Sequence, residues 1–302
     1  MQISSGIVFT SGLSITGDSG ASSKKAIFGY GYTNTNVSMT NLVSDTGVVA
    51  ADTTGVGSAR YSSAAAGYGG DKAIFGYGYT ITYVSLTNLV SNTGVVGNDV
   101  TGVGTARAYP SAAGYGTDKA IFGYGMNPIY SMTNLVSNTG VVATDTTGVG
   151  TARYALAAAG YGTDKAIFGY GTPGYLSMTN LVSNTGVVGN DVTGVGTARY
   201  GLAAAGYGTD KAIFGYGFTG ALVSITNLVS NTGVVATDTT GVGTARYYHA
   251  AAGYGTDKAI FGYGNDNNNV SMTNLVSNTG VVATDTTGVG TARAYLAAAA
   301  YG

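Results

Sequence analysis

The chain has 302 residues, a formal net charge of −1 and only 9% charged residues. This balance excludes the basic footprint that binds nucleic acid, and no apolar run approaches the ~20 residues that a membrane-spanning helix needs. Cysteine is absent, which excludes disulfide frameworks, cysteine metal sites and cysteine nucleophiles.

The first 24 residues differ from the rest of the chain. They are rich in Ser and Gly, with one strand-like stretch around Ile7 to Phe9. The opening M-Q-I-S-S-G-I-V-F-T lacks the positive start and the long apolar stretch of a secretion signal. Residues 1–24 are therefore predicted to be an N-terminal extension, either a linker or an added strand.

A unit of 46 or 47 residues then occurs six times, and each copy contains K-A-I-F-G-Y-G. Such a period indicates a repeat architecture in which each unit is one supersecondary element that packs on its neighbours. Residues 25–302 are therefore predicted to form one array. The lysines that open the run are Lys25, Lys72, Lys119, Lys165, Lys211 and Lys258.

Each unit holds four short runs suited to β-strands, such as L-A-A-A-G-Y, K-A-I-F-G-Y, L-S-M-T-N-L-V and G-V-V-A-T-D. The turns Y-G-T-D-K and S-N-T-G are rich in residues that tolerate positive φ in tight hairpins. Four short antiparallel strands per unit predict an all-β fold, a six-bladed β-propeller of four-stranded blades. An open β-solenoid is the alternative.

The two ends of the array divide one unit between them. The array begins at the second run, at Lys25, and stops after a first run, A-A-A-A-Y-G at Ala297 to Gly302. In a closed ring the C-terminal strand would pair beside the first strand, whereas an open solenoid would need distinct caps. A monomeric ring, closed by pairing of the C-terminal strand with the first blade, is therefore expected.

Read from each arginine, the unit runs R-x-x-x-A-A-G-Y-G-T-D-K-A-I-F-G-Y-G, a variable loop, S-M-T-N-L-V-S-N-T-G-V-V and G-V-G-T-A-R. Over residues 25–302 this pattern resembles the kelch repeat, with an arginine before the innermost strand and glycines that end the second. It differs in the split G-Y-G, in a valine at the fourth-strand tryptophan, and in a leucine such as Leu181 at the third-strand tyrosine. The resemblance implies a propeller that binds ligands on one face.

The near-identity of the copies is also similar to repeat proteins of marine viruses and phages. In those genomes such arrays occur in structural or tail proteins. That similarity implies a location in the virion or outside the cell.

The copies differ in two patches, one between G-Y-G and the third strand and one directly after each arginine. In an up-and-down blade both patches emerge on one face and the constant turns on the other. The variable residues are rich in Tyr, Asn, Thr and Ser, the composition of adaptable binding loops. Neutral drift of exposed loops is the alternative explanation.

The predicted ligand-binding residues all lie in these two patches. They are Tyr32, Asn34, Tyr61, Tyr79, Tyr83, Tyr109, Met126, Tyr130, Tyr154, Tyr175, Tyr200, Phe218, Tyr247, His249, Asn265, Asn267 and Tyr295.

No catalytic residue, metal site or cofactor is predicted. Glutamate is absent, and each repeated arginine follows an aspartate by eight residues, as Arg60 follows Asp52, which favours a structural tie over unlike groups in one asymmetric pocket. His249 lacks ligand-spaced partners, and N-D-N-N-N at Asn265 to Asn269 is favoured as a solvated loop over an oxygen-ligand site.

These observations favour a non-enzymatic binding propeller that recognises a glycan or a surface protein, as a viral or microbial attachment module. The alternative is a structural spacer or scaffold domain without a ligand. Nucleic acid and membrane insertion are not expected.

Overall fold

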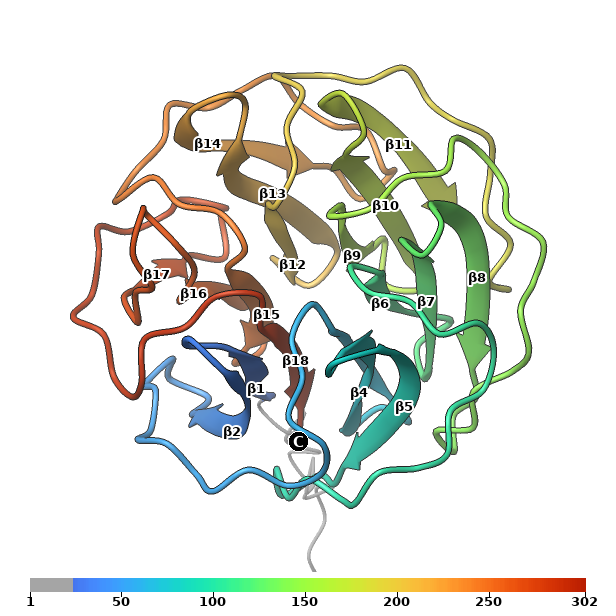
Figure 1. The fold of residues 1–302 in the computed structure, drawn as a ribbon. Helices are drawn as coiled ribbons and strands as arrows, with labels where there is room; N and C mark the ends of the chain where they lie inside the picture. The colour runs from blue at the N-terminus through green and yellow to red at the C-terminus, as the bar shows by residue number, and fades with distance from the viewer. Residues whose placement is uncertain (1–23) are drawn as a thin grey trace, which may run out of the picture.

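The computed structural model describes residues 24–302, which consist of β-strands, turns and connections. The strands form six three-stranded antiparallel sheets. Figure 1 shows these sheets placed like blades around a common centre. No helix in the described part is long and apolar enough to cross a membrane. The predicted N-terminal extension lies outside the described residues except for Lys24.

Each sheet contains one inner, one middle and one outer strand. The inner strands are β3 (Ala64–Tyr68), β6 (Ser111–Tyr115), β9 (Ala157–Tyr161), β12 (Ala203–Tyr207), β15 (Ala250–Tyr254) and β18 (Ala297–Tyr301). The middle strands are β1 (Lys25–Tyr32), β4 (Lys72–Tyr79), β7 (Lys119–Gly125), β10 (Lys165–Gly171), β13 (Lys211–Phe218) and β16 (Lys258–Gly262). The outer strands are β2 (Asn36–Val43), β5 (Tyr83–Val90), β8 (Tyr130–Val136), β11 (Leu176–Val182), β14 (Leu222–Val229) and β17 (Thr273–Val276).

Five sheets use three consecutive strands, and the sixth joins the two ends of the described chain. In that sheet the order is β18-β1-β2, and β18 pairs with β1 from Lys25↔Tyr301 to Gly29↔Ala297. The other inner–middle pairs have the same antiparallel register, for example Tyr68↔Lys72 to Ala64↔Gly76 in β3 and β4. The split unit of the sequence is thus reassembled within one sheet.

Small side chains allow the six inner strands to lie close together around the centre. Each inner strand is made almost entirely of Ala and Gly and contacts the inner strands on both sides of it. A Cβ on Gly67 would lie 3.1 Å from the carbonyl oxygen of Ala300 in the neighbouring inner strand. The small residues of this run therefore suit the close approach of two backbones, because a larger side chain would push the strands apart.

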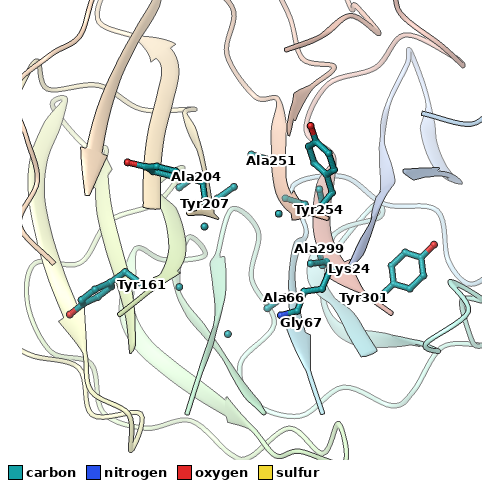
Figure 2. Close-up of a pocket in the computed structure, with 18 of the residues that line it drawn as sticks. Lys24, Ala66, Gly67, Tyr161, Ala204, Tyr207, Ala251, Tyr254, Ala299 and Tyr301 are labelled. Atoms are coloured by element: carbon teal, nitrogen blue, oxygen red, sulfur yellow. The ribbon is translucent and has the colours of Figure 1, made fainter. Parts of the chain in front are cut away.

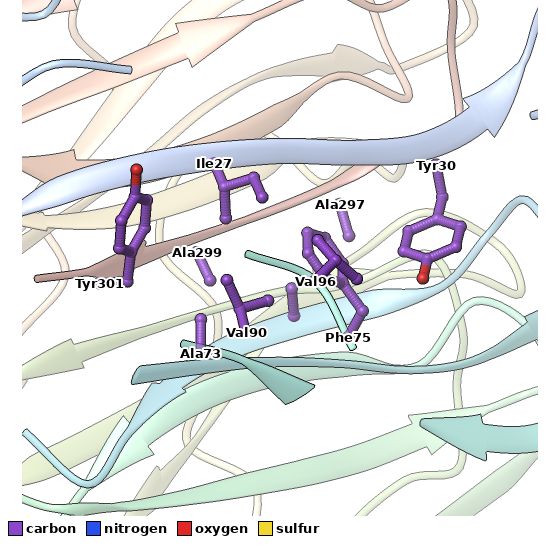
Figure 3. Close-up of a cluster of buried hydrophobic side chains, with 10 residues drawn as sticks. Ile27, Tyr30, Ala73, Phe75, Val90, Val96, Ala297, Ala299 and Tyr301 are labelled. Atoms are coloured by element: carbon purple, nitrogen blue, oxygen red, sulfur yellow. The ribbon is translucent and has the colours of Figure 1, made fainter. Parts of the chain in front are cut away.

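The hydrophobic core lies between neighbouring sheets. Figure 3 shows one such interface, where Ile27 and Tyr30 of β1 and residues of β18 face Phe75 of β4. The rings of Tyr30 and Phe75 meet edge to face with centroids 5.1 Å apart. The equivalent pair Tyr77 and Phe122 repeats the arrangement in the next interface, also at 5.1 Å. The K-A-I-F-G-Y run is constant because both of its faces are buried against a neighbour.

The prediction of four strands per blade was wrong. The segment after each outer strand forms only two isolated bridges to it, such as Val90↔Val96 and Thr87↔Val100. Side-chain hydrogen bonds hold this segment in place of a regular backbone ladder. For example, the Asn88 amide donates to the carboxylate of Asp99 at 2.9 Å. The Gly-, Thr- and Asp-rich segment lacks the alternating apolar residues that would hold a regular edge strand.

Two sets of backbone hydrogen bonds link each sheet to the next around the centre. On one side, an N–H donates to the equivalent carbonyl of the preceding sheet over 2.7–3.4 Å. These residues are Ser62, Tyr109, Ala155, Gly201, Tyr248 and Tyr295. On the other side, a glycine N–H donates over 2.7–2.8 Å to a carbonyl of the next sheet, as Gly69 does to Asp118 and Gly302 to Asp71. The backbone itself therefore fixes the spacing of the inner strands.

Candidate functional site

Both variable patches lie together at the same end of each sheet. The residue after each arginine forms an isolated bridge with the start of the variable loop, as in Tyr61↔Tyr79, Ala108↔Met126 and Tyr200↔Phe218. The constant turn between inner and middle strands, such as residues 69–71, lies at the opposite end of the same pair of strands. We call the surface formed by the two variable patches the variable face and the surface formed by the constant turns the uniform face.

An aromatic cluster on the variable face spans two neighbouring sheets. Tyr61 contacts Tyr32 of the sheet that contains β1 and Tyr79 of its own sheet, with ring centroids 5.4 and 5.5 Å apart. Tyr83 packs edge to face on Tyr79 at 5.1 Å. Four predicted residues from three loops thus form one surface, because the Tyr61↔Tyr79 bridge and the packing of neighbouring sheets bring these loops together.

A second aromatic cluster lies over the sheets that contain β10, β13 and β16. Tyr175 stacks on Tyr200 with centroids 5.7 Å apart and planes 22° apart. Phe218 lies 5.6 Å from Tyr200 and 5.7 Å from Tyr247. Tyr175 is 39% exposed, so this cluster offers aromatic surface to the solvent.

Three further tyrosines, Tyr109, Tyr248 and Tyr295, meet at the centre of the variable face, and we call them the axial tyrosines. The centroids of Tyr248 and Tyr295 are 4.1 Å apart, and Tyr109 lies 5.8 Å from Tyr248 and 6.1 Å from Tyr295. Burial raises the pKa of all three phenols. All three adopt left-handed backbone conformations with φ of 50–57°, and the equivalent residues Ser62, Ala155 and Gly201 also have positive φ, so this conformation belongs to the repeat.

The remaining predicted residues are less closely grouped. Tyr154 contacts Tyr109 at 5.8 Å, and Met126 lies beside Ala108. Tyr130 lines a separate groove with Asp145 on the outer side of its sheet. Asn34 is exposed at the tip of its loop.

The N-D-N-N-N loop is organised by its own hydrogen bonds. The N–H of Asn267 donates to Asn265 Oδ1 at 3.0 Å, and the amide of Asn265 donates to Asn269 Oδ1 at 3.2 Å. Residues 24–302 contain no group of three or more His, Cys, Asp or Glu side chains that could hold a metal ion. The loop therefore offers amides to the solvent rather than a closed set of oxygen ligands.

The uniform face holds the larger central cavity, of about 290 Å³. Figure 2 shows that alanines and glycines of the inner strands line it, while Tyr161 and Tyr207 point away from the centre. Its lysines are half exposed, and Lys72 forms an ion pair with the adjacent Asp71 at 3.0 Å. Four other pairs repeat this arrangement, so these charges largely neutralise each other. Lysines and threonines belong to the lining, so this cavity also offers side-chain hydrogen-bonding groups.

The repeated arginines are buried structural residues, and their carboxylate partner is not the one that the sequence suggested. Arg60 has no exposed surface and donates to Asn88 Oδ1 at 2.6 Å. Its nearest carboxylate is Asp99, at 3.8 Å in the same sheet, rather than Asp52. Its guanidinium also lies 4.1 Å from the ring centroid of Tyr30 in the neighbouring sheet. Each arginine therefore ties two sheets together.

His249 is buried rather than displayed on the variable face. Its ring lies against Tyr216 and Phe261, with centroids 5.1 and 5.7 Å away. Burial holds its pKa well below the usual value, and Arg246 and Arg199 add to this effect. The imidazole is therefore neutral at pH 7.

The buried neutral histidine predicts a specific loss of stability in acid. The unfolded chain protonates its histidine near pH 6.5, whereas the folded chain stays unprotonated to much lower pH. The unfolded state therefore gains protons first, and lowering the pH from 7 to 5 is expected to lower the free energy of unfolding by about 2 kcal/mol.

The control for this prediction is His249→Leu, because Leu156, Leu202 and Leu296 occupy the equivalent position in three other copies. This variant is expected to be about 1–3 kcal/mol more stable at pH 7, since it removes buried imidazole nitrogens that lack partners. Urea unfolding between pH 5 and 7 measures both effects. An equal acid sensitivity in both proteins would contradict the assignment, because His249 is the single histidine of the sequence.

Three residues of the variable face were missed from sequence, namely Tyr248, Ser62 and Ser63. The signal was present in the repeat, because Ser62 and Tyr248 occupy the second position after the arginine, where Tyr109 and Tyr295 also lie. Alignment of the copies at the arginine groups these positions, and the structure brings them together at the centre. A scan of protein-family models finds no match to the chain, and a search of curated proteins finds none either.

Proposed function

We propose that this protein is a non-enzymatic binding module that recognises a glycan through its variable face. The observation that carries the proposal is the uncharged aromatic surface made by the two clusters. Among the residues of the variable patches, Asp266 is the only one that carries a charge at pH 7. Such a surface suits an uncharged ligand, since charged ligands are recognised by complementary charges.

Aromatic rings beside amides and hydroxyls suit sugars in particular. A sugar ring has an apolar face that packs on an aromatic ring and a rim of hydroxyls that need hydrogen bonds. Tyr175 and Phe218 supply the first kind of contact, and the amide-rich loop around Asn267 supplies the second. A glycan carried on a surface protein would be recognised in the same way.

The finer identity of the fold is part of the same proposal. We infer a closed, kelch-like propeller, which is supported by the arginine and glycine positions of the repeat and by the pairing of β18 with β1. The near-identical copies support a setting in a viral or phage particle, where the module would serve in attachment.

The proposed function predicts which surface mutations abolish binding. We expect at least ten-fold weaker binding of the glycans found on an array in each of three variants, Tyr83→Ala, Tyr175→Ala and Phe218→Ala. Aromatic contacts carry most of the energy of such an interface. Tyr130→Ala is expected to have a smaller effect, since Tyr130 lies in the separate groove. Affinity is measured by titration calorimetry with the best glycan.

Matched changes on the uniform face provide the control. Asp71→Ala, Lys72→Ala, Asn92→Ala and Thr93→Ala lie in the constant turns and are expected to leave affinity unchanged. Loss of binding in these variants alone would assign the function to the uniform face. Failure of every glycan on the array would refute the proposal and favour a structural spacer without a ligand.

A further inference from the structure

A small cavity of about 80 Å³, which we call the axial cavity, lies at the centre of the six sheets beneath the variable face. Each of the six sheets contributes the second and third residues after its arginine to the lining. The axial tyrosines form part of this lining, together with Pro110 and three leucines. The volume is several times the roughly 10–15 Å³ that one water needs, so the cavity has room for a small group of a ligand.

Several residues that line this cavity carry unpartnered polar atoms. Five buried side-chain nitrogen or oxygen atoms in residues 24–302 have no hydrogen-bond partner, and four of them belong to Ser62, Ser63 and His249. These three side chains line the cavity from two different sheets and are at most 8% exposed. A buried polar atom without a hydrogen-bond partner is unfavourable, so this concentration in one place indicates a partner that occupies the cavity.

Weak interactions with neighbouring protein groups do not satisfy these atoms. The Ser62 hydroxyl lies near the Tyr109 phenol and opposes the rise in its pKa that burial causes. The Gly215 backbone likewise opposes the fall that burial causes in the pKa of His249. Neither contact reaches hydrogen-bond geometry for the serine or imidazole atoms. The donors and acceptors therefore remain free to bind a ligand.

Comparison of the copies shows that these polar residues replace leucine. The third residue after the arginine is leucine in three sheets, where Leu156, Leu202 and Leu296 are buried in the core. The same position holds Ser63 and His249 in two other sheets. Both replacements introduce polar atoms into a site where leucine packs well, and such a loss of stability is typical of residues kept for function.

The chemistry of the cavity selects an uncharged ligand with hydroxyl groups. Ser62 and Ser63 can each donate and accept, and a neutral imidazole supplies one donor and one acceptor. No charged side chain belongs to the lining in the described part of the chain. The surrounding rings and leucines are apolar, which favours a short carbon chain that carries hydroxyls over an ion or a free amine.

We propose that the axial cavity binds a hydroxyl-bearing arm of a sugar or polyol, with Ser62, Ser63 and His249 as its hydrogen-bonding partners. The axial tyrosines cover this arm, and the aromatic clusters of the variable face hold the rest of the sugar. The inference rests on the proposed glycan recognition and adds the group that enters the centre of the ring.

The single histidine makes the test direct. Selective ¹⁵N labelling of histidine labels one imidazole ring, whose two nitrogen signals are followed by NMR during titration with glycerol, glucose, galactose, mannose and N-acetylglucosamine. At least one of these probes is expected to shift the imidazole resonance in a saturable way. Ser63→Leu fills the cavity but keeps the imidazole. It is therefore expected to lower the affinity for that probe at least ten-fold and to raise the midpoint of thermal unfolding.

Pro110→Leu is the matched control, because it restores leucine at the same repeat position of another sheet without removing a polar group. It is expected to bind the probe as the unchanged protein does. Equal binding by the Ser63→Leu protein and the Pro110→Leu protein would overturn the axial site. So would a panel in which no probe shifts the imidazole, or a crystal grown with the probe that holds only water in the cavity.

Failure of the axial site can be distinguished from failure of the proposed glycan recognition. If Phe218→Ala abolishes glycan binding while Ser63→Leu and His249→Leu bind normally, the axial site is wrong and recognition by the variable face stands. If no glycan or monosaccharide binds, both proposals are wrong.

Discussion

Deletion of residues 295–302 is expected to destroy most of the stability of the protein. The deletion removes β18, which pairs with five residues of β1 and supplies Ala297, Ala299 and Tyr301 to the core of Figure 3. It also removes the hydrogen bonds that Tyr295 and Gly302 make to neighbouring sheets. We expect a loss of about 5 kcal/mol or more, a large part of the 5–15 kcal/mol typical of a folded domain. Urea unfolding measures the loss.

The exposed edge of β1 gives this prediction a second readout. Without β18, the backbone groups of Lys25 to Gly29 lack their partners, and an open edge recruits a strand from another chain. We therefore expect dimers or larger swapped species in light scattering after size-exclusion chromatography.

A circular permutant is the matched control for the deletion. It joins residue 302 to residue 24, leaves out residues 1–23 and places the new ends in the loop of residues 265–269. It therefore keeps every strand of residues 24–302 and moves the chain break. This protein is expected to stay monomeric and close to the parent in stability. A truncated protein that is monomeric and melts within a degree or two of the parent would show that the ring does not depend on its terminal strand.

The repeat allowed much of the fold to be predicted. The alternation of short strand runs with turn residues located the inner, middle and outer strands, and the divided unit at Lys25 and Gly302 indicated the pairing of β18 with β1. These features are local in sequence or repeat many times. They can therefore be predicted from the sequence without knowing which sheets contact each other.

Contacts between sheets were harder to predict from the sequence. Asp52 lies close in sequence to Arg60 but accepts hydrogen bonds from Thr291, because the segment that carries Asp52 belongs to a different sheet. The same limit applies to the variable face. Tyr32 and Tyr61 lie in different sheets, and their contact depends on the spacing of the ring rather than on any local pattern.

The buried His249 illustrates the difference between a variable position and an exposed one. Its place among varied residues predicted a surface group, yet it occupies a position where three other copies bury leucine. Variation at a buried position in otherwise near-identical copies is less easily explained by drift than variation in a loop. Such positions are therefore better indicators of function than the loop tips.

Replacement of one repeated arginine is expected to have the largest effect of any single substitution. Arg153 is fully buried and donates from Nε to the Tyr170 carbonyl at 2.9 Å and from Nη2 to Asn180 Oδ1 at 2.6 Å. Its guanidinium also lies 4.3 Å from the ring centroid of Tyr124 in the preceding sheet. Arg153→Ala leaves two buried acceptors without donors and opens a cavity, which together predict a loss of about 3–5 kcal/mol.

Two further variants separate the parts of this interaction. Arg153→Lys keeps the charge but cannot reach both acceptors with a planar fork, so it is expected to recover less than half of the loss. Asp191→Asn tests the distant carboxylate, which lies 3.8 Å from Nη1 and remains partly exposed. Asp191 accepts from the Thr151 hydroxyl on Oδ2 at 2.7 Å and from the Asn180 amide on Oδ1 at 2.9 Å. Asparagine has one oxygen and can keep only one of these acceptor roles, so this change is expected to cost about 1–3 kcal/mol.

The arginine variants also show whether the repeated arginines bind the ligand or act as a structural tie that only holds two sheets together. All three proteins are expected to bind the glycan normally at temperatures where they are folded, since the guanidinium is sealed between two sheets and away from the variable face. Normal stability with lost binding in Arg153→Ala would contradict this expectation. A structural tie instead predicts that lost stability and retained affinity occur together, and that the same result follows at Arg199, whose hydrogen bonds repeat those of Arg153 in the next sheet.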